Sequence, residues 1–292
     1  MNLLGVYNNG NYKVEIYDDG TKIRETNEDI FISSFPECID LKITNQCDMK
    51  CKYCHEDSSI NGKHGDILNA EFINTLYPYT EIAIGGGNAL SHPDLIPFLK
   101  ILKQNNIIAN ITINQNHFIS QQKLINYLIN GNLIKGLGVS LTSFTDEFIN
   151  LVKNYNNAVI HLINGIITLE EMQKLYNNNL KVLILGYKEF RRGKKYYSQE
   201  IENNKKLFYD NIHEIVKSFK VISFDNLAIE QLKLKRIFTN KNWNKFYMGD
   251  DGQFTMYIDL VEKEFAPSST SMKRYKIRDN IVNMFKMVKN TH

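Results

Sequence analysis

The chain has 292 residues, of which 43% are hydrophobic and 23% charged, and its formal net charge is +3. This length is enough for one large α/β domain with a sizeable core or for two smaller domains. The small charge argues against nucleic acid as a partner, and no apolar run approaches the roughly eighteen residues of a membrane span. The first residues lack the basic start and apolar stretch of a signal peptide, so we expect a cytoplasmic protein without a membrane partner.

Residues 1–36 are predicted to form a small N-terminal β-meander. Asn9-Gly10 and Asp19-Gly20 are dipeptides that tight hairpin turns prefer, because both central positions need a positive φ. Apolar and polar residues alternate over 12–16, which is the period-two pattern of a strand. Three short strands joined by two tight turns follow from this pattern.

From Cys38 onward, strand-like apolar runs alternate with amphipathic helix-like runs. Strands are predicted over residues 38–44, 81–84, 107–113, 133–141, 158–163 and 180–185. Helices are predicted over residues 68–78, 93–104, 121–129, 146–154 and 169–176. Such alternation implies parallel strands joined by helical crossovers. We therefore predict an α/β fold whose main unit, residues 37–195, is a partial (β/α)6 barrel.

Residues 196–292 are predicted to form an α/β extension that closes the barrel. It contains a long amphipathic helix reaching Phe219, a short strand over 221–224, a β-hairpin around 254–265 and a final helix. The final helix is predicted to have one apolar side, formed by Ile277, Ile281, Phe285 and Val288.

Three of the four cysteines lie on one short segment that follows the first predicted barrel strand. Cys47, Cys51 and Cys54 have C-x3-C-x2-C spacing, and Cys38 begins the strand. In a reducing compartment, clustered cysteines indicate metal or redox chemistry in place of a disulfide framework. Four-iron clusters held wholly by protein use four cysteines, so three thiolates leave one iron open for a ligand.

The alternative is a non-catalytic module in which zinc or an iron–sulfur cluster is structural or acts as a sensor. Structural zinc takes four ligands, and the candidates for the fourth are Cys38, His55 and His64. The strand–helix context disfavours this alternative. Cys38 itself is expected to be a small buried hydrophobe, because it lies at the start of its strand and not at the reactive end.

Glycines and polar residues follow the other predicted strand ends. Gly85-Gly86-Gly87-Asn88 ends the second barrel strand, Asn114 follows the third, and Ser140 lies on the fourth. In barrels of parallel strands the reactive site lies at the C-terminal strand ends. We therefore expect these residues to converge with the cysteine segment on one face.

The cysteine segment resembles the signature of the radical S-adenosylmethionine (radical SAM) superfamily. That signature is C-x3-C-x2-C with an aromatic residue before the last cysteine, and Tyr53 fills the aromatic place. The glycine run and the segment after it resemble the family's second-strand motif. Asn114 and Ser140 stand where many members carry an asparagine and a serine. The resemblance covers about residues 38–190.

The resemblance implies a [4Fe-4S] cluster on Cys47, Cys51 and Cys54, with S-adenosylmethionine beside it. The implied cofactor-binding residues are Tyr53, Gly85, Gly86, Gly87, Asn88, Asn114 and Ser140. It further implies an external one-electron reductant of the flavodoxin or ferredoxin type. The products of cofactor cleavage would be methionine and a 5′-deoxyadenosyl radical that abstracts hydrogen from an unidentified substrate. A peptide or protein is slightly favoured as substrate, ahead of a small molecule and of nucleic acid.

This chain departs from the family pattern in two respects. The family usually has an acidic residue where Asn88 stands, so we expect the amide oxygen of Asn88 to accept the cofactor's hydrogen bond. A second cysteine cluster, found in many peptide-modifying relatives, is missing from the sequence.

The basic loop 188–195 is predicted to lie on the reactive face, with Lys188, Arg191 and Arg192 as candidates for binding the cofactor's carboxylate.

Overall fold

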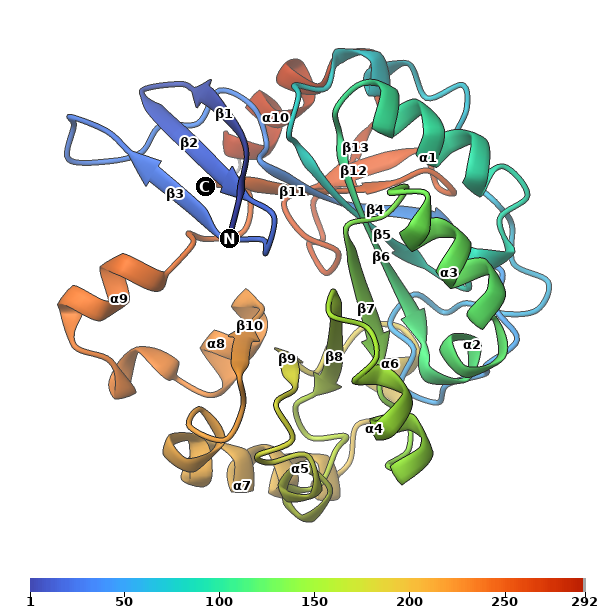
Figure 1. Cartoon of the computed structure of the whole chain (residues 1–292), viewed down its shortest axis with the longest axis vertical. Helices are drawn as coiled ribbons and strands as arrows, with labels where there is room; N and C mark the ends of the chain where they lie inside the picture. Colours follow the sequence, from blue (N-terminus) through green and yellow to red (C-terminus); the bar gives the residue numbers. More distant parts are fainter. Residues whose placement is uncertain (291–292) are drawn as a thin grey trace.

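The computed structural model describes residues 1–290 and begins with a small antiparallel sheet (Figure 1). Its strands are β1 (Leu3–Asn9), β2 (Tyr12–Tyr17) and β3 (Lys22–Glu25), in that spatial order. The predicted meander is therefore confirmed. It packs through Tyr12 on Phe254, which directly precedes a strand of the main sheet.

The main sheet has ten strands, and its central part is parallel. Seven parallel strands follow in chain order: β4 (Cys38–Thr44), β5 (Glu81–Gly86), β6 (Ile108–Asn114), β7 (Gly136–Ser140), β8 (Ala158–Ile163), β9 (Lys181–Leu185) and β10 (Val221–Phe224). The other edge of β4 pairs in parallel with β11 (Thr255–Asp259). Two antiparallel strands, β12 (Glu264–Ala266) and β13 (Tyr275–Lys276), complete the sheet. The predicted α/β partial barrel is confirmed.

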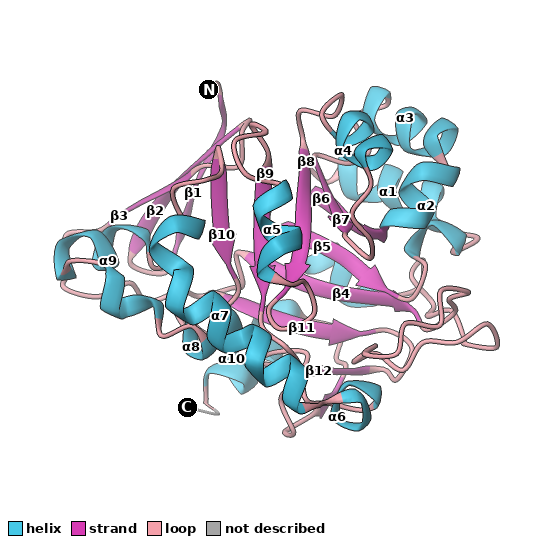
Figure 2. Cartoon of the chain, turned by 90° about the horizontal axis from the view of Figure 1, so that it is seen from below, coloured by secondary structure: helices cyan, strands magenta, loops and turns pink. Residues whose placement is uncertain are grey.

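Most of the ten helices of the described residues lie on the outer side of the curved sheet, whereas the ninth lies away from it (Figures 1 and 2). The ten helices are α1 (Leu95–Gln104), α2 (Gln115–Ser120), α3 (Gln122–Asn130), α4 (Asp146–Val152), α5 (Leu169–Lys174), α6 (Arg192–Tyr196), α7 (Gln199–Ile215), α8 (Asn226–Gln231), α9 (Asn240–Phe246) and α10 (Ile281–Lys289). Alternate strand residues such as Ile39, Leu41 and Ile43 are fully buried in one core with helix residues such as Phe98. Because side chains alternate along a strand, the residues between them face the interior of the barrel.

The predicted helix over residues 68–78 is wrong. Only one 3₁₀ turn, η1 (Glu71–Thr75), forms there, and Ala70 at its start offers no side-chain cap. Pro78 then excludes the helical conformation for the residue before it, which shortens the segment further. Ile277 also differs from the prediction, since it lies before α10 and not within it.

Several short elements have no counterpart in the sequence prediction: η2 (Ala89–Ser91), α2, α6, α8, η3 (Leu234–Ile237) and α9. Each spans seven residues or fewer, too short for a helical period to stand out. Residues 291–292 of the predicted C-terminal extension lie outside the described residues. Within residues 1–290, no helix has both the length and the apolar character needed to cross a membrane.

Candidate active site

The three clustered cysteines lie on the loop that follows β4, residues 45–64, which we call the cysteine loop. Their thiols are free and half-buried. Burial raises the pKa of Cys47 and of Cys51 above the ordinary value of a thiol. A thiolate is the form that ligates a metal. The positive charge of the metal therefore has to offset the rise in thiol pKa that burial causes.

The candidates for a fourth zinc ligand lie elsewhere or have other partners. Cys38 is at the opposite end of β4, where burial raises its pKa strongly. His55 Nε2 lies 3.3 Å from Glu56 Oε1, and His64 Nδ1 lies 2.9 Å from the Thr44 hydroxyl. Among residues 1–290, the structure gathers no three His, Cys, Asp or Glu side chains closely enough to hold a metal ion, and this includes the three cysteines of the loop.

The glycine run at the end of β5 lies directly beside the cysteine loop. The Gly87 N–H donates to the carbonyl of Thr44, and the Asn88 N–H donates to the carbonyl of Gln46, each over 2.7 Å. Gln46 is the residue before Cys47. The structure therefore brings the predicted glycine run and the predicted cysteine segment together.

Each glycine of the run has a different steric role. Gly86 has a φ of 111°, and a Cβ there would lie 2.3 Å from the Thr44 carbonyl oxygen. A Cβ on Gly87 would lie 2.2 Å from the Gln46 carbonyl oxygen, so both positions require glycine. A Cβ on Gly85 would meet nothing within 4 Å. Since Ile84 is buried on the helix side, Gly85 faces open space in the barrel interior.

Asn88 has a buried acceptor without a donor. The residue is 8% exposed, and its side-chain oxygen has no hydrogen-bond partner among the described residues. An unsatisfied buried polar atom costs about 1–3 kcal/mol. This atom is therefore suited to a donor supplied by a ligand.

The next strand ends add polar groups at the same edge. The registers pair Asn114 with Ser140 and Ser140 with His161, so these three residues lie side by side on β6, β7 and β8. The Asn114 side-chain oxygen accepts a hydrogen bond from the Asn116 N–H over 2.9 Å and so caps α2. Its amide nitrogen and the Ser140 hydroxyl are the polar groups left for a ligand.

His161 is a site residue that the sequence prediction missed. A Cβ on Gly138 would lie 2.4 Å from the imidazole Cε1, so the ring covers this glycine on the neighbouring strand. Burial lowers the pKa of His161 to about 4, so its imidazole is neutral at pH 7. The signal available in the sequence was a histidine inside the aliphatic run 158–163.

The cysteine loop is also fixed by α2 and α6. His117 on α2 lies 2.7 Å from Asp48, and this hydrogen bond lowers the pKa of the Asp48 carboxyl. The Tyr53 ring lies 6.1 Å from the Tyr196 ring at the end of α6. Burial raises the pKa of Tyr53 to about 12, so its phenol is neutral.

The basic loop lies on the predicted face, but its guanidinium groups have partners there. Arg191 donates to the Glu56 carbonyl over 2.8 Å. Arg192 donates to the Ser58 carbonyl and lies 2.9 Å from an Asp57 carboxylate oxygen. These two arginines therefore hold the cysteine loop, while Arg192 Nε has no hydrogen-bond partner among the described residues.

Lys188 differs from the two arginines because it has no carboxylate within ion-pair distance among the described residues. Its ammonium donates to the Ser269 hydroxyl over 2.8 Å and lies 3.4 Å from His55 Nε2. The predicted contact with a cofactor carboxylate stays a prediction for Lys188, Arg191 and Arg192.

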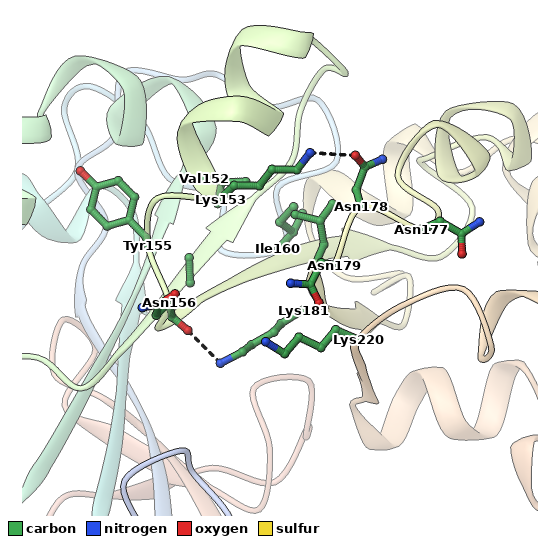
Figure 3. Close-up of a pocket in the computed structure, with 12 residues that line it drawn as sticks. Val152, Lys153, Tyr155, Asn156, Ile160, Asn177, Asn178, Asn179, Lys181 and Lys220 are labelled. Atoms are coloured by element: carbon green, nitrogen blue, oxygen red, sulfur yellow. Dashed lines mark hydrogen bonds between the residues drawn. The ribbon is translucent and has the colours of Figure 1, made fainter. Parts of the chain in front are cut away.

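A pocket of about 370 Å³ lies at the opposite, N-terminal edge of the sheet, beside the starts of β8 and β9 (Figure 3). Two of its three lysines have structural partners: Lys153 donates to the Asn178 side chain and Lys181 to the Asn156 carbonyl, each over 2.8 Å. Lys153 also follows the C-terminus of α4, where the helix dipole favours a cation. This pocket is separate from the strand ends that carry the predicted site.

A family model described as the radical SAM superfamily matches residues 41–189, just over half of the chain. The chain belongs to the radical SAM superfamily. The matched region runs from within β4 to the loop after β9 and contains the three clustered cysteines and the seven predicted cofactor-binding residues. The cofactors of this superfamily are a [4Fe-4S] cluster and S-adenosylmethionine.

The radical SAM relatives resemble parts of this chain. A probable GTP 3′,8-cyclase from Methanococcus maripaludis is 30% identical over 88 residues, which are 28% of this chain and 29% of the cyclase. The structure of Streptococcus suis SuiB bound to precursor peptide SuiA has 15% identity and a TM-score of 0.61. That match covers 87% of this chain and 65% of the SuiB chain, so this chain spans less than two thirds of the cyclase and of this SuiB chain.

SuiB bound to S-adenosylmethionine, also from Streptococcus suis, has 15% identity and a TM-score of 0.58, and covers 87% of this chain and 68% of the SuiB chain. At this identity the likeness shows a shared radical SAM fold.

The chemistry of the residues at the site fits both radical SAM cofactors, although the three thiols are not drawn together in this structure. The cysteine loop offers three thiols, while the fourth, Cys38, is at the far end of β4, so an iron would be left open. Gly85 leaves open space at the strand end, and the unpaired oxygen of Asn88 suits the amino group of S-adenosylmethionine.

Proposed function

We propose that Cys47, Cys51 and Cys54 hold the [4Fe-4S] cluster and that S-adenosylmethionine binds between the cysteine loop and the ends of β5, β6 and β7. The observation that carries this proposal is the pair of 2.7 Å hydrogen bonds from Gly87 and Asn88 to the backbone before Cys47. When bound, the two cofactors supply the one-electron cleavage that yields methionine and a 5′-deoxyadenosyl radical for hydrogen abstraction.

The chain's own residues bind and orient. Gly85 lets the ligand approach the strand backbone, and Asn88 accepts a hydrogen bond from the ligand's amino group. The Asn114 amide nitrogen and the Ser140 hydroxyl provide polar contacts on the adjoining strands. The neutral phenol of Tyr53 packs beside the cysteines without adding charge. Gly86 and Gly87 act indirectly, because they allow the run to pack on the cysteine loop.

A peptide or protein is the substrate class that we propose. The support is the fold shared with SuiB, whose structure is bound to a precursor peptide. A flavodoxin- or ferredoxin-type protein is the proposed electron donor. The cytoplasm is the proposed compartment, because its reducing conditions keep the cysteine thiols available for iron.

Metal content after anaerobic purification and reconstitution tests the proposal. We expect about four irons per chain, as in a cubane cluster, and loss of iron in Cys51→Ala. Cys38→Ala is the matched control, because it removes a thiol at the other end of β4, away from the cysteine loop. This variant should retain iron. Near-stoichiometric zinc without iron would instead support the non-catalytic module.

A further inference from the structure

A fully buried lysine lies next to the cysteine loop. Lys42, on β4, is 1% exposed, and its Nζ lies 2.9 Å from a carboxylate oxygen of Glu56 and 2.9 Å from one of Asp259. The three residues belong to β4, to the cysteine loop and to β11, and we call them the buried triad. A buried ammonium persists only where carboxylates pair with it, so the triad holds these three elements together.

The triad acts on the cysteine-bearing end of the loop, because Glu56 is two residues after Cys54. The Tyr257 hydroxyl on β11 lies 3.3 Å from Glu56 and 3.4 Å from Asp259, which links the two carboxylates. From the other side, Arg191 lies 3.6 Å from the Glu56 carboxylate. Glu56 is thus held by groups from three elements, and two of them, β11 and the loop after β9, are far from it in sequence.

The rest of the cysteine loop has little structure of its own. Residues 45–64 contain no helix or strand, and the loop is crossed by backbone hydrogen bonds such as Cys47 N–H to the Ser59 carbonyl over 2.8 Å. A loop without helix or strand loses conformational freedom when it gathers three thiols around one ligand. A device that orders the loop beforehand lowers that cost.

We infer that Lys42 is a positioning residue that orders the cysteine loop before the cluster binds. The inference rests on the proposed function, because it takes the cluster as the ligand of this loop. It also gives β11 a role: the register pairs Lys42 with Asp259 on β11 and with Gly85 on β5. The strand added beside β4 therefore supplies the second carboxylate that a buried lysine needs.

The structure offers a matched control at the other end of the barrel. Lys22 in the meander is also buried, with 7% of its side chain exposed, and its Nζ lies 2.5 Å from Glu81 and 3.6 Å from Glu37. Lys22→Met and Lys42→Met each leave two carboxylates without their lysine. A general loss of stability should follow from both substitutions, whereas an effect on the cysteine loop should follow only from Lys42→Met.

Hydrogen exchange of the full-length, iron-free protein is the test. In Lys42→Met we expect the amides of Cys47 and Ser59 to exchange about tenfold faster or more than in the wild type, and in Lys22→Met to be unchanged. Loading with iron and sulfide should slow in Lys42→Met alone, and the electron paramagnetic resonance spectrum of its reduced cluster should broaden. Asp259→Asn, which keeps the side-chain volume, should reproduce the loop effect if Lys42→Met does not fold.

Equal loop exchange in the two lysine variants, or a wild-type loop already unprotected without iron, would overturn the inference. A different result would overturn the proposed function: wild-type protein that loads four irons and shows no cleavage of S-adenosylmethionine. In that case the exchange difference between the lysine variants would still stand.

Discussion

Replacing Gly85 with alanine should separate the stability of the barrel from the binding of S-adenosylmethionine. The added methyl group meets nothing within 4 Å in the protein, and the φ of Gly85 lies outside the left-handed region. At such positions Gly→Ala raises the free energy of unfolding by about 0.4–1 kcal/mol, because the unfolded chain loses freedom. For a chain of this size the melting temperature should rise by roughly 1–3 °C.

The same methyl group should weaken cofactor binding. If S-adenosylmethionine approaches the strand backbone at Gly85, the methyl occupies space that the cofactor needs. Overpacking of one methyl group costs about 1–3 kcal/mol. The dissociation constant should therefore rise by between about 5-fold and 150-fold.

Gly86→Ala is the matched control for Gly85→Ala. Its Cβ would lie 2.3 Å from the Thr44 carbonyl oxygen at a φ of 111°, so it should destabilise the protein before any ligand is added, by about 1–3 kcal/mol from backbone strain alone. Denaturant unfolding of iron-free protein measures stability, and equilibrium dialysis of iron-loaded protein measures affinity. A Gly85→Ala protein that binds S-adenosylmethionine as tightly as the wild type would refute the assignment of this space to the cofactor.

Three further substitutions test the site and its electrostatics. Asn88→Ala should raise the dissociation constant of S-adenosylmethionine by about 10-fold or more, because a hydrogen bond to a charged donor is worth about 1.5–3 kcal/mol. Unchanged affinity in equilibrium dialysis would contradict the role of the unpaired Asn88 oxygen. The pKa of His161 is about 4 in the folded protein, below its unfolded value of about 6.5. The unfolded state therefore binds a proton first as the pH falls from 6.5 through 4. The free energy of unfolding should decrease over this range, by at most ~3 kcal/mol. Urea unfolding from pH 7.5 to 4.5 should therefore show a weaker pH dependence in His161→Gln, and identical curves would exclude this explanation. Asp40 is solvent-exposed on β4, but desolvation by the surrounding barrel and the neighbouring carboxylates raise its pKa to about 6, which penalises its charged form in the folded state above pH 6. Asp40→Asn should thus raise the free energy of unfolding at pH 7.5 by about 1 kcal/mol, a figure reduced for solvent screening. The gain in stability should be smaller at pH 4.5. A gain in stability that does not depend on pH would contradict the charge effect.

Local signals made the barrel and the cysteine loop predictable. The strands over 38–44, 158–163 and 221–224 have the bounds expected from their apolar runs. The cysteine spacing lies within eight residues, and its place after a strand depends only on that strand being recognised. Such features can be predicted from the sequence because they do not depend on what the segment packs against.

Features that depend on distant parts of the chain were not predictable. β11 pairs with β4 although more than two hundred residues separate them, so the carboxylate partner of Lys42 could not be read from the sequence around it. Arg191 and Arg192 were expected near a cofactor carboxylate because they are basic and lie on the right face. Their partners, the carbonyls of Glu56 and Ser58, become visible only in three dimensions.

Reductive cleavage of S-adenosylmethionine tests the central claim most directly. Protein reconstituted with iron and sulfide under anaerobic conditions is mixed with dithionite and S-adenosylmethionine, and 5′-deoxyadenosine is quantified by chromatography. The account predicts that the wild type and Cys38→Ala release 5′-deoxyadenosine and that Cys51→Ala releases none. Fully iron-loaded wild-type protein that forms no 5′-deoxyadenosine would contradict it.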